Sequence, residues 1–238
     1  MRESPVVNHR QTDHRAKSPA VPAIALVLIA NLIPLYSVLA HDWPVVYVVM
    51  LFWFDALMFV AFTAIRILIA PVPGDLSLVL ARKTAIAAVV LSAFYKTVVA
   101  AVTLAFHGGL VLGYGIFLAF LFGGQVTPRG IVASPDVPLE VMTNMLHEPA
   151  VYWAALAILG NHLYALAVGF IVRGGWRTAQ PVLLFEAPTR HVLVLHVGIV
   201  LGGIVLMLLA TPLIAAAVLL VAKTVSDLRL LILDRGAS

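Results

Sequence analysis

The chain has 238 residues, of which 62% are hydrophobic and 11% are charged, and its mean hydropathy is +1.05. This composition excludes an ordinary soluble domain and, because the apolar runs are long and unbroken, a barrel of short alternating strands; it is typical of a helical membrane protein with several spans. The absence of cysteine excludes disulfides and thiolate chemistry, and a net charge of +4 does not argue for a nucleic-acid partner.

The first 19 residues differ in character from the rest of the chain. Residues 1–19 are polar and basic, without a pattern that could bury a core, so we expect a disordered tail there. Residues 20–235 are then predicted to form a single transmembrane helical domain. Its first two spans cover about 20–40 and 44–69, and a loop rich in proline and glycine follows the second.

The region from Thr84 to Gly123 is long enough for either one or two spans. With one span, from about Tyr95 to Gly123, residues 76–94 would form an interfacial or re-entrant lead-in. Every lysine and arginine except Arg129 then falls on one side of the membrane. Because basic residues concentrate on the cytoplasmic side, this distribution favours six spans with both termini in the cytoplasm.

The remaining spans are predicted at about 150–173, 192–210 and 212–233, with a turn at Thr211-Pro212 joining the last two. We therefore expect an all-α integral membrane bundle of six transmembrane helices, a multi-pass protein of the inner (cytoplasmic) membrane whose partner is the lipid bilayer. Small residues four apart, at Gly109 and Gly113 and again at Gly198 and Gly202, would allow close helix contacts and a homo-oligomer.

Ionisable side chains recur inside the spans at similar depths. Measured from the outer helix ends, one group lies at roughly 17 Å and the other at roughly 23 Å. The first group comprises Asp55, His162 and Lys223, and the second comprises His107, His196 and Asp227. Charged groups at membrane depth normally turn inward onto a partner, so the pattern predicts a polar centre inside the bundle.

Three kinds of function fit such a centre, of which the first is the main hypothesis and the other two are alternatives. The first is a metal-dependent membrane enzyme or redox protein, with His107, His162 and His196 binding a divalent metal (Zn or Fe) and with catalytic roles for Asp55, Lys223 and Asp227. Haem between two facing histidines is a less favoured cofactor. The second is a proton-coupled transporter of a small solute, in which Asp55 and Lys223 carry the change of charge.

The third is a non-catalytic membrane scaffold, in which the same side chains only hold helices together. Asp55 and Lys223 would then neutralise each other, and His196 and Asp227 would clip the last two spans together. His107 would hydrogen-bond a neighbouring carbonyl.

Short motifs that contain these residues resemble those of a known family. They are FWFD with Asp55, FHGG with His107, Asn161-His162, PTRHVLVLH with Arg190 and His196, KTVSD with Lys223 and Asp227, and the opening NLIPLYSVLAHDW from Asn31 to Trp43. The set is similar to an uncharacterised polytopic membrane protein family of archaea and bacteria, domain of unknown function 6498. The resemblance implies the same residue set and supplies no reaction.

Three positions depart from the family pattern. Asp55 stands where glutamate is usual, Gly108 where tyrosine is usual, and Tyr114 where a further histidine is expected. A site built on four histidines is therefore not expected here.

Overall fold

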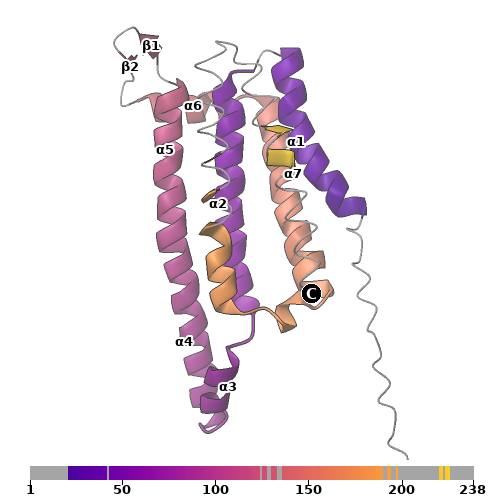
Figure 1. Cartoon of the computed structure of the whole chain (residues 1–238), viewed down its shortest axis with the longest axis vertical. Coiled ribbons are helices and arrows are strands. Elements are labelled where there is room, and N and C mark those ends of the chain that lie inside the picture. The colour runs from indigo at the N-terminus through magenta and orange to yellow at the C-terminus, as the bar shows by residue number, and fades with distance from the viewer. Residues whose placement is uncertain are drawn as a thin grey trace, which may run out of the picture.

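The computed structural model of the chain describes residues 21–41, 43–123, 125–127, 130–132, 136–189, 192–193, 197, 220–221 and 223–225. Its long helices run side by side (Figure 1). Three segments of the described chain are long and apolar enough to cross a membrane: Val46–Leu80, Ala85–Ala119 and Pro149–Val172. The protein is therefore helical and suited to a membrane.

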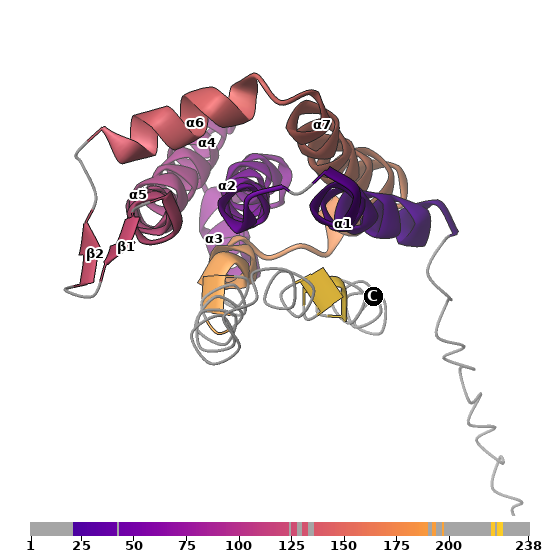
Figure 2. The same ribbon diagram turned by 90° about the horizontal axis from the view of Figure 1, so that it is seen from above.

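Helix α2 (Val45–Ile69) is the central element of the bundle. It packs against α4 (Ala85–Thr103), α5 (Gly109–Gly123) and α7 (Pro149–Tyr164), and Figure 2 shows it between them. Val48 and Val49 point about 100° apart on this helix, and both are fully buried. The helix ends before Ala70-Pro71, since a residue that precedes proline is disfavoured in the helical conformation.

Helix α1 (Val21–His41) packs mainly on α7 and is inclined to the other helices (Figure 1). Helix α7 starts with Pro149, which suits the first helical turn, and continues through a π-helical segment, η2 (Ala165–Val172). The helix ends before Gly174, whose positive φ of 76° provides the left-handed stop. A short 3-10 turn, η3 (Gly175–Arg177), and a helix at 181–189 follow.

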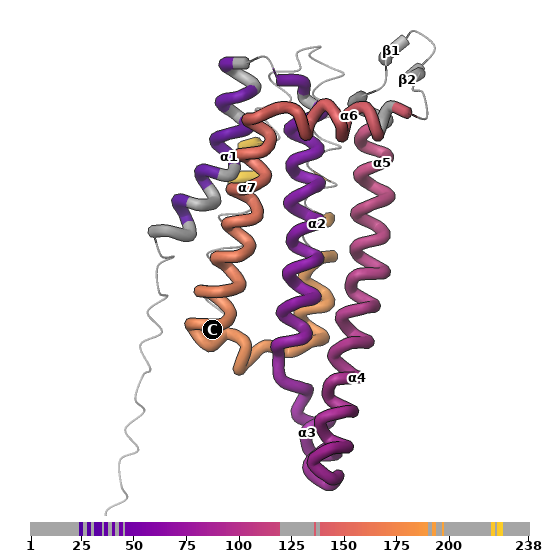
Figure 3. The backbone as a smooth tube through the Cα atoms, turned by 180° about the vertical axis from the view of Figure 1, so that it is seen from behind, coloured from indigo at the N-terminus to yellow at the C-terminus, as the bar shows by residue number. Residues whose placement is uncertain are grey.

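The region that could have held two spans is one unbroken helix. A π-helical turn, η1 (Leu104–Gly108), joins α4 to α5, and the 39 residues from Ala85 to Gly123 would be roughly 58 Å long. The helix begins at Thr84, whose hydroxyl accepts a hydrogen bond from the Ala87 N–H. Residues 76–94 comprise part of α3 (Gly74–Leu80), a turn and the start of α4, and Figure 3 shows both helices extending past the end of α2.

The loop after α5 contains structure that the sequence did not predict. β1 (Gln125–Thr127) and β2 (Gly130–Val132) form a small antiparallel hairpin, so the described part of the chain is all-α apart from this pair. Helix α6 (Val137–Leu146) follows and lies across the ends of the long helices (Figure 2). Its Val141 and Met145 are one turn apart and are buried against the core. Asp136 precedes the helix at its N-terminal end.

Four of the six predicted spans correspond to described helices, and three of these helices are long and apolar enough to cross a membrane. Helices α1, α2, α4–α5 and α7 coincide with the first four, although the third begins ten residues earlier than the predicted Tyr95. The last two spans lie outside the described residues except for a few helical positions at 192–193, 197, 220–221 and 223–225. The predicted tail at 1–19 and both termini also lie outside the described residues.

A candidate buried charge centre

One face of α2 presents a stripe of aromatic residues interrupted by a carboxylate. Phe52, Asp55, Phe59 and Phe62 are spaced by three, four and three residues, so they lie on the same side of the helix. Asp55 is only 6% exposed. A carboxylate buried this deeply within a membrane-spanning helix requires partners from other helices, because no water is available to solvate it.

Two other helices supply those partners. The Asp55 Oδ1 atom lies 2.8 Å from Nε2 of His162 on α7, and Oδ2 lies 2.9 Å from Nζ of Lys223. All three side chains are largely buried. As their common predicted depth indicates, the first group of ionisable residues meets in one place. We call Asp55, His162 and Lys223 the charge triad.

Aromatic rings enclose the charge triad on the α2 side. The His162 ring stacks on Phe62, with centroids 5.5 Å apart and planes 20° apart, and it meets Phe59 edge-on at 6.2 Å. The Lys223 ammonium lies 5.6 Å from the centroid of the Phe52 ring. These contacts hold the imidazole and the ammonium on either side of the carboxylate and keep the surroundings apolar.

The second predicted group is only partly described. His107 on η1 is 1% exposed, whereas His196 and Asp227 lie outside the described residues. The Nε2 atom of His107 lies 2.9 Å from Oγ1 of Thr189, at the end of the 181–189 helix, and Phe185 meets the ring edge-on. Its Nδ1 atom is buried without a well-formed hydrogen bond among the described residues, although the Thr103 backbone, one turn earlier, lies close enough to interact with the ring. Thr189 was not predicted as a partner.

The described residues do not assemble a metal site. Within them, no three histidine, cysteine or acidic side chains come together in a way that could hold an ion. His162 contacts Asp55 beside a lysine ammonium, whereas His107 contacts Thr189. The predicted set of His107, His162 and His196 therefore stays a prediction that depends on where His196 lies.

Both buried histidines lie next to irregular helical turns. His107 is within η1, and His162 precedes η2 by three residues. Insertions of this kind are frequent at functional sites, because they redirect a side chain without ending the helix. Nothing in the apolar pattern of the two spans predicts them.

A side-chain hydrogen bond also joins α2 to α5, two residues before Asp55 in the sequence. Trp53 donates a hydrogen bond from Nε1 to the Val111 carbonyl at 2.7 Å, so the tryptophan is a packing residue that faces α5. A Cβ atom at Gly115 would lie 2.2 Å from that nitrogen. By contrast, Gly109 and Gly113, which the sequence singled out, have open space around them among the described residues.

Comparisons with known proteins assign the sequence to a group without assigning a reaction. Residues 13–238 match a family described as "Family of unknown function (DUF6498)". No curated protein and no solved structure matches the chain.

Proposed function

The chain belongs to the family of unknown function DUF6498, and we propose that it is a proton-coupled transporter of a small solute whose charge triad carries the change of charge. One observation supports this proposal above all others. A single buried carboxylate, Asp55, bridges an imidazole on α7 and an ammonium on a further helical segment. Ionisable chains of this kind inside membranes typically mark proton relays and ion pathways.

Protonation would change how the helices are held together. With a neutral imidazole, the carboxylate and the ammonium cancel and the charge triad is neutral, which suits an apolar interior. A proton bound by Asp55 would abolish its attraction for the Lys223 ammonium and leave that link weaker. Movement of the segment that carries Lys223 relative to α2 would then follow proton binding, which is the coupling that such a transporter needs.

A metal-dependent membrane enzyme or redox protein is the second candidate, and a different observation favours it. The buried Nδ1 atom of His107 lacks a well-formed hydrogen bond among the described residues, and a bound metal would satisfy it. His196 and Asp227 would have to complete such a site. Metal analysis of the purified protein tests this candidate: stoichiometric zinc or iron that is lost in His107→Ala supports it, and metal-free protein after incubation with both ions contradicts it.

Solute-driven proton uptake into liposomes tests the transporter directly. Purified protein is reconstituted with a trapped pH-sensitive dye, and mixtures of amino acids, sugars or organic acids are added outside at a lower external pH. We expect one mixture to accelerate internal acidification, and we expect Asp55→Asn to slow that component at least tenfold. Asp75→Asn is the matched control, since Asp75 is an exposed carboxylate in the first turn of α3.

Two outcomes would contradict the transporter. The first is wild-type protein that elutes as a folded, monodisperse species and acidifies vesicles no faster than empty vesicles with every mixture. The second is Asp55→Asn protein that elutes identically and retains the full solute-dependent rate. If Asp55→Asn and His162→Ala lost thermal stability alone, the scaffold function would be favoured.

A further inference from the structure

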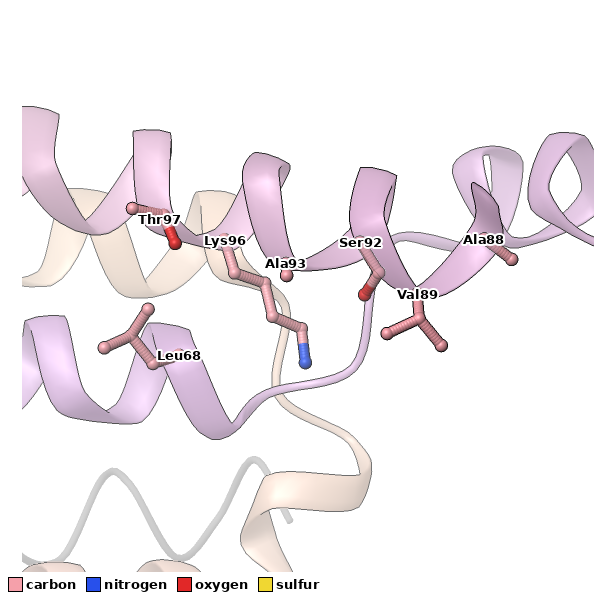
Figure 4. A pocket seen from close by; sticks show the side chains of 7 residues that line it. All are labelled: Leu68, Ala88, Val89, Ser92, Ala93, Lys96 and Thr97. Atoms are coloured by element: carbon pink, nitrogen blue, oxygen red, sulfur yellow. The ribbon is translucent and has the colours of Figure 1, made fainter. Parts of the chain in front are cut away.

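A groove lies between α4 and the end of α2, away from the charge triad. It has a volume of about 490 Å³ and is lined by Leu68 of α2 and by Ala88, Val89, Ser92, Ala93, Lys96 and Thr97 of α4. Four of the α4 residues, at 89, 92, 93 and 96, repeat with the spacing of one helix face. In Figure 4 the Lys96 side chain and the Ser92 hydroxyl both extend from α4 toward the side on which Leu68 lies.

The groove lies at the level of a membrane surface. Lys96 is 27 residues from Gly123 (123 − 96), or roughly 40 Å along the helix, whereas a hydrocarbon core is about 30 Å thick. Leu68 is correspondingly near the end of α2. Arg82 and Lys83, in the turn before α4, lie on the same side of the bilayer, which is the predicted cytoplasmic side.

The lining combines one positive charge with hydroxyl and apolar groups. None of the lining residues is acidic, and Lys96 has no ion pair or hydrogen bond to another described residue. Ser92 and Thr97 add two hydroxyl donors, and Leu68 and Val89 are substantially exposed apolar side chains. An ammonium and hydroxyls beside exposed apolar surface suit a phosphate that is attached to acyl chains.

We propose that this groove binds the headgroup phosphate of an anionic phospholipid from the cytoplasmic leaflet. Lys96 neutralises the phosphate, the hydroxyls of Ser92 and Thr97 hydrogen-bond its oxygens, and the acyl chains begin against Leu68 and the exposed apolar surface of α4. The lining of the groove shares no residue with the charge triad, so this lipid site does not depend on the transport mechanism.

Lipid binding to the detergent-purified protein tests the proposal. Phosphatidylglycerol, phosphatidylcholine and soluble glycerol 3-phosphate are added separately, and bound molecules are counted by native mass spectrometry alongside the melting temperature. We expect phosphatidylglycerol to bind and raise the melting temperature, and the other two to have little effect. Lys96→Gln should weaken phosphatidylglycerol binding about fivefold, whereas Lys96→Arg should retain it.

Lys83→Gln is the matched control, because Lys83 is an exposed lysine of the same membrane side that does not line the groove. Equal binding of phosphatidylglycerol by wild type and a folded Lys96→Gln protein would overturn the proposal. So would equal weakening by Lys83→Gln, which would indicate general surface charge. A response to glycerol 3-phosphate as strong as the response to the lipid would also overturn it, because the acyl chains would then contribute nothing.

Discussion

Asp55 makes two contacts of different electrical character. Its contact with Lys223 joins opposite charges, whereas its contact with His162 joins a charge to an imidazole whose charge depends on a proton. In a low-dielectric interior, removing one member of such a pair is costly, because the other is left with less compensation. Removing both members together is much less costly, since an apolar pair of similar size can pack in their place.

We therefore predict strong coupling between Asp55 and Lys223 in a double-mutant cycle. Asp55→Leu alone should lower the free energy of unfolding by about 3 kcal/mol, and Lys223→Met alone should have a similar effect. The double variant should be more stable than the sum of the two losses implies. Unfolding in mixed detergent micelles measures this, with Asp75→Ala as an exposed control; strictly additive losses would argue against a functional or structural pair.

The sequence predicts the charge triad because of the regular helical rise. Each helix advances by a fixed distance per residue, so residues at equal distances from the same membrane surface arrive at the same level. Asp55, His162 and Lys223 meet that condition although 107 residues separate the first two. The Thr189 partner of His107 could not be found this way, because threonine is not ionisable and lies outside the predicted spans.

At the scale of the elements, α2 and α5 approach closely at one point. The Trp53 indole occupies the place that a side chain at position 115 would need, and it hydrogen-bonds the Val111 carbonyl one turn earlier. The small-residue pattern at Gly109 and Gly113 did not predict this approach at Gly115, and close contacts at those two glycines stay a prediction. Gly115 can be identified only from the direction in which the Trp53 side chain points, and that direction cannot be predicted from the spacing of small residues.

Gly115→Ala should therefore destabilise the protein by about 1–3 kcal/mol, because the added methyl group overpacks the contact with Trp53. Gly113→Ala is the matched control: it places the same methyl group two residues away, where no described atom lies within contact distance, and should change stability by less than about 0.5 kcal/mol. Thermal unfolding measures both. A Gly115→Ala protein as stable as Gly113→Ala would show that α5 does not hold Trp53 in this way.

The irregular elements were the least predictable. The π-helical turns at η1 and η2 leave the apolar pattern unchanged, so the sequence predicts ordinary α-helical spans there. The hairpin and α6 lie between two predicted spans and are too short to be spans themselves, although Val141 and Met145 of α6 have the spacing of one helix face. The asymmetry of lysine and arginine favoured one span over two in this region, but that span was predicted to begin at about Tyr95, whereas the helix begins at Ala85.

At the scale of the whole molecule, the membrane orientation can be tested with unusual ease because the chain contains no cysteine. Ala81→Cys lies between α3 and α4, and Leu146→Cys lies at the end of α6; both positions are exposed. If the basic side is cytoplasmic, a membrane-impermeant maleimide should label Leu146→Cys in intact cells and Ala81→Cys only after the membrane is opened. The reverse pattern would invert the proposed orientation, and labelling of both positions in intact cells would contradict a membrane-spanning bundle.

The distance along the chain between the members of the charge triad has a consequence for biosynthesis. Asp55 leaves the ribosome 168 residues before Lys223 (223 − 55), which at about 5–20 residues per second is on the order of 10–30 s. During that interval α2 must be inserted into the membrane while the Asp55 carboxylate does not yet have Lys223 as its partner. A nascent chain that stalls before Lys223 therefore exposes an acidic helix within the bilayer, and quality-control proteases that recognise unpaired intramembrane charge would have a signal that disappears only when Lys223 has been inserted.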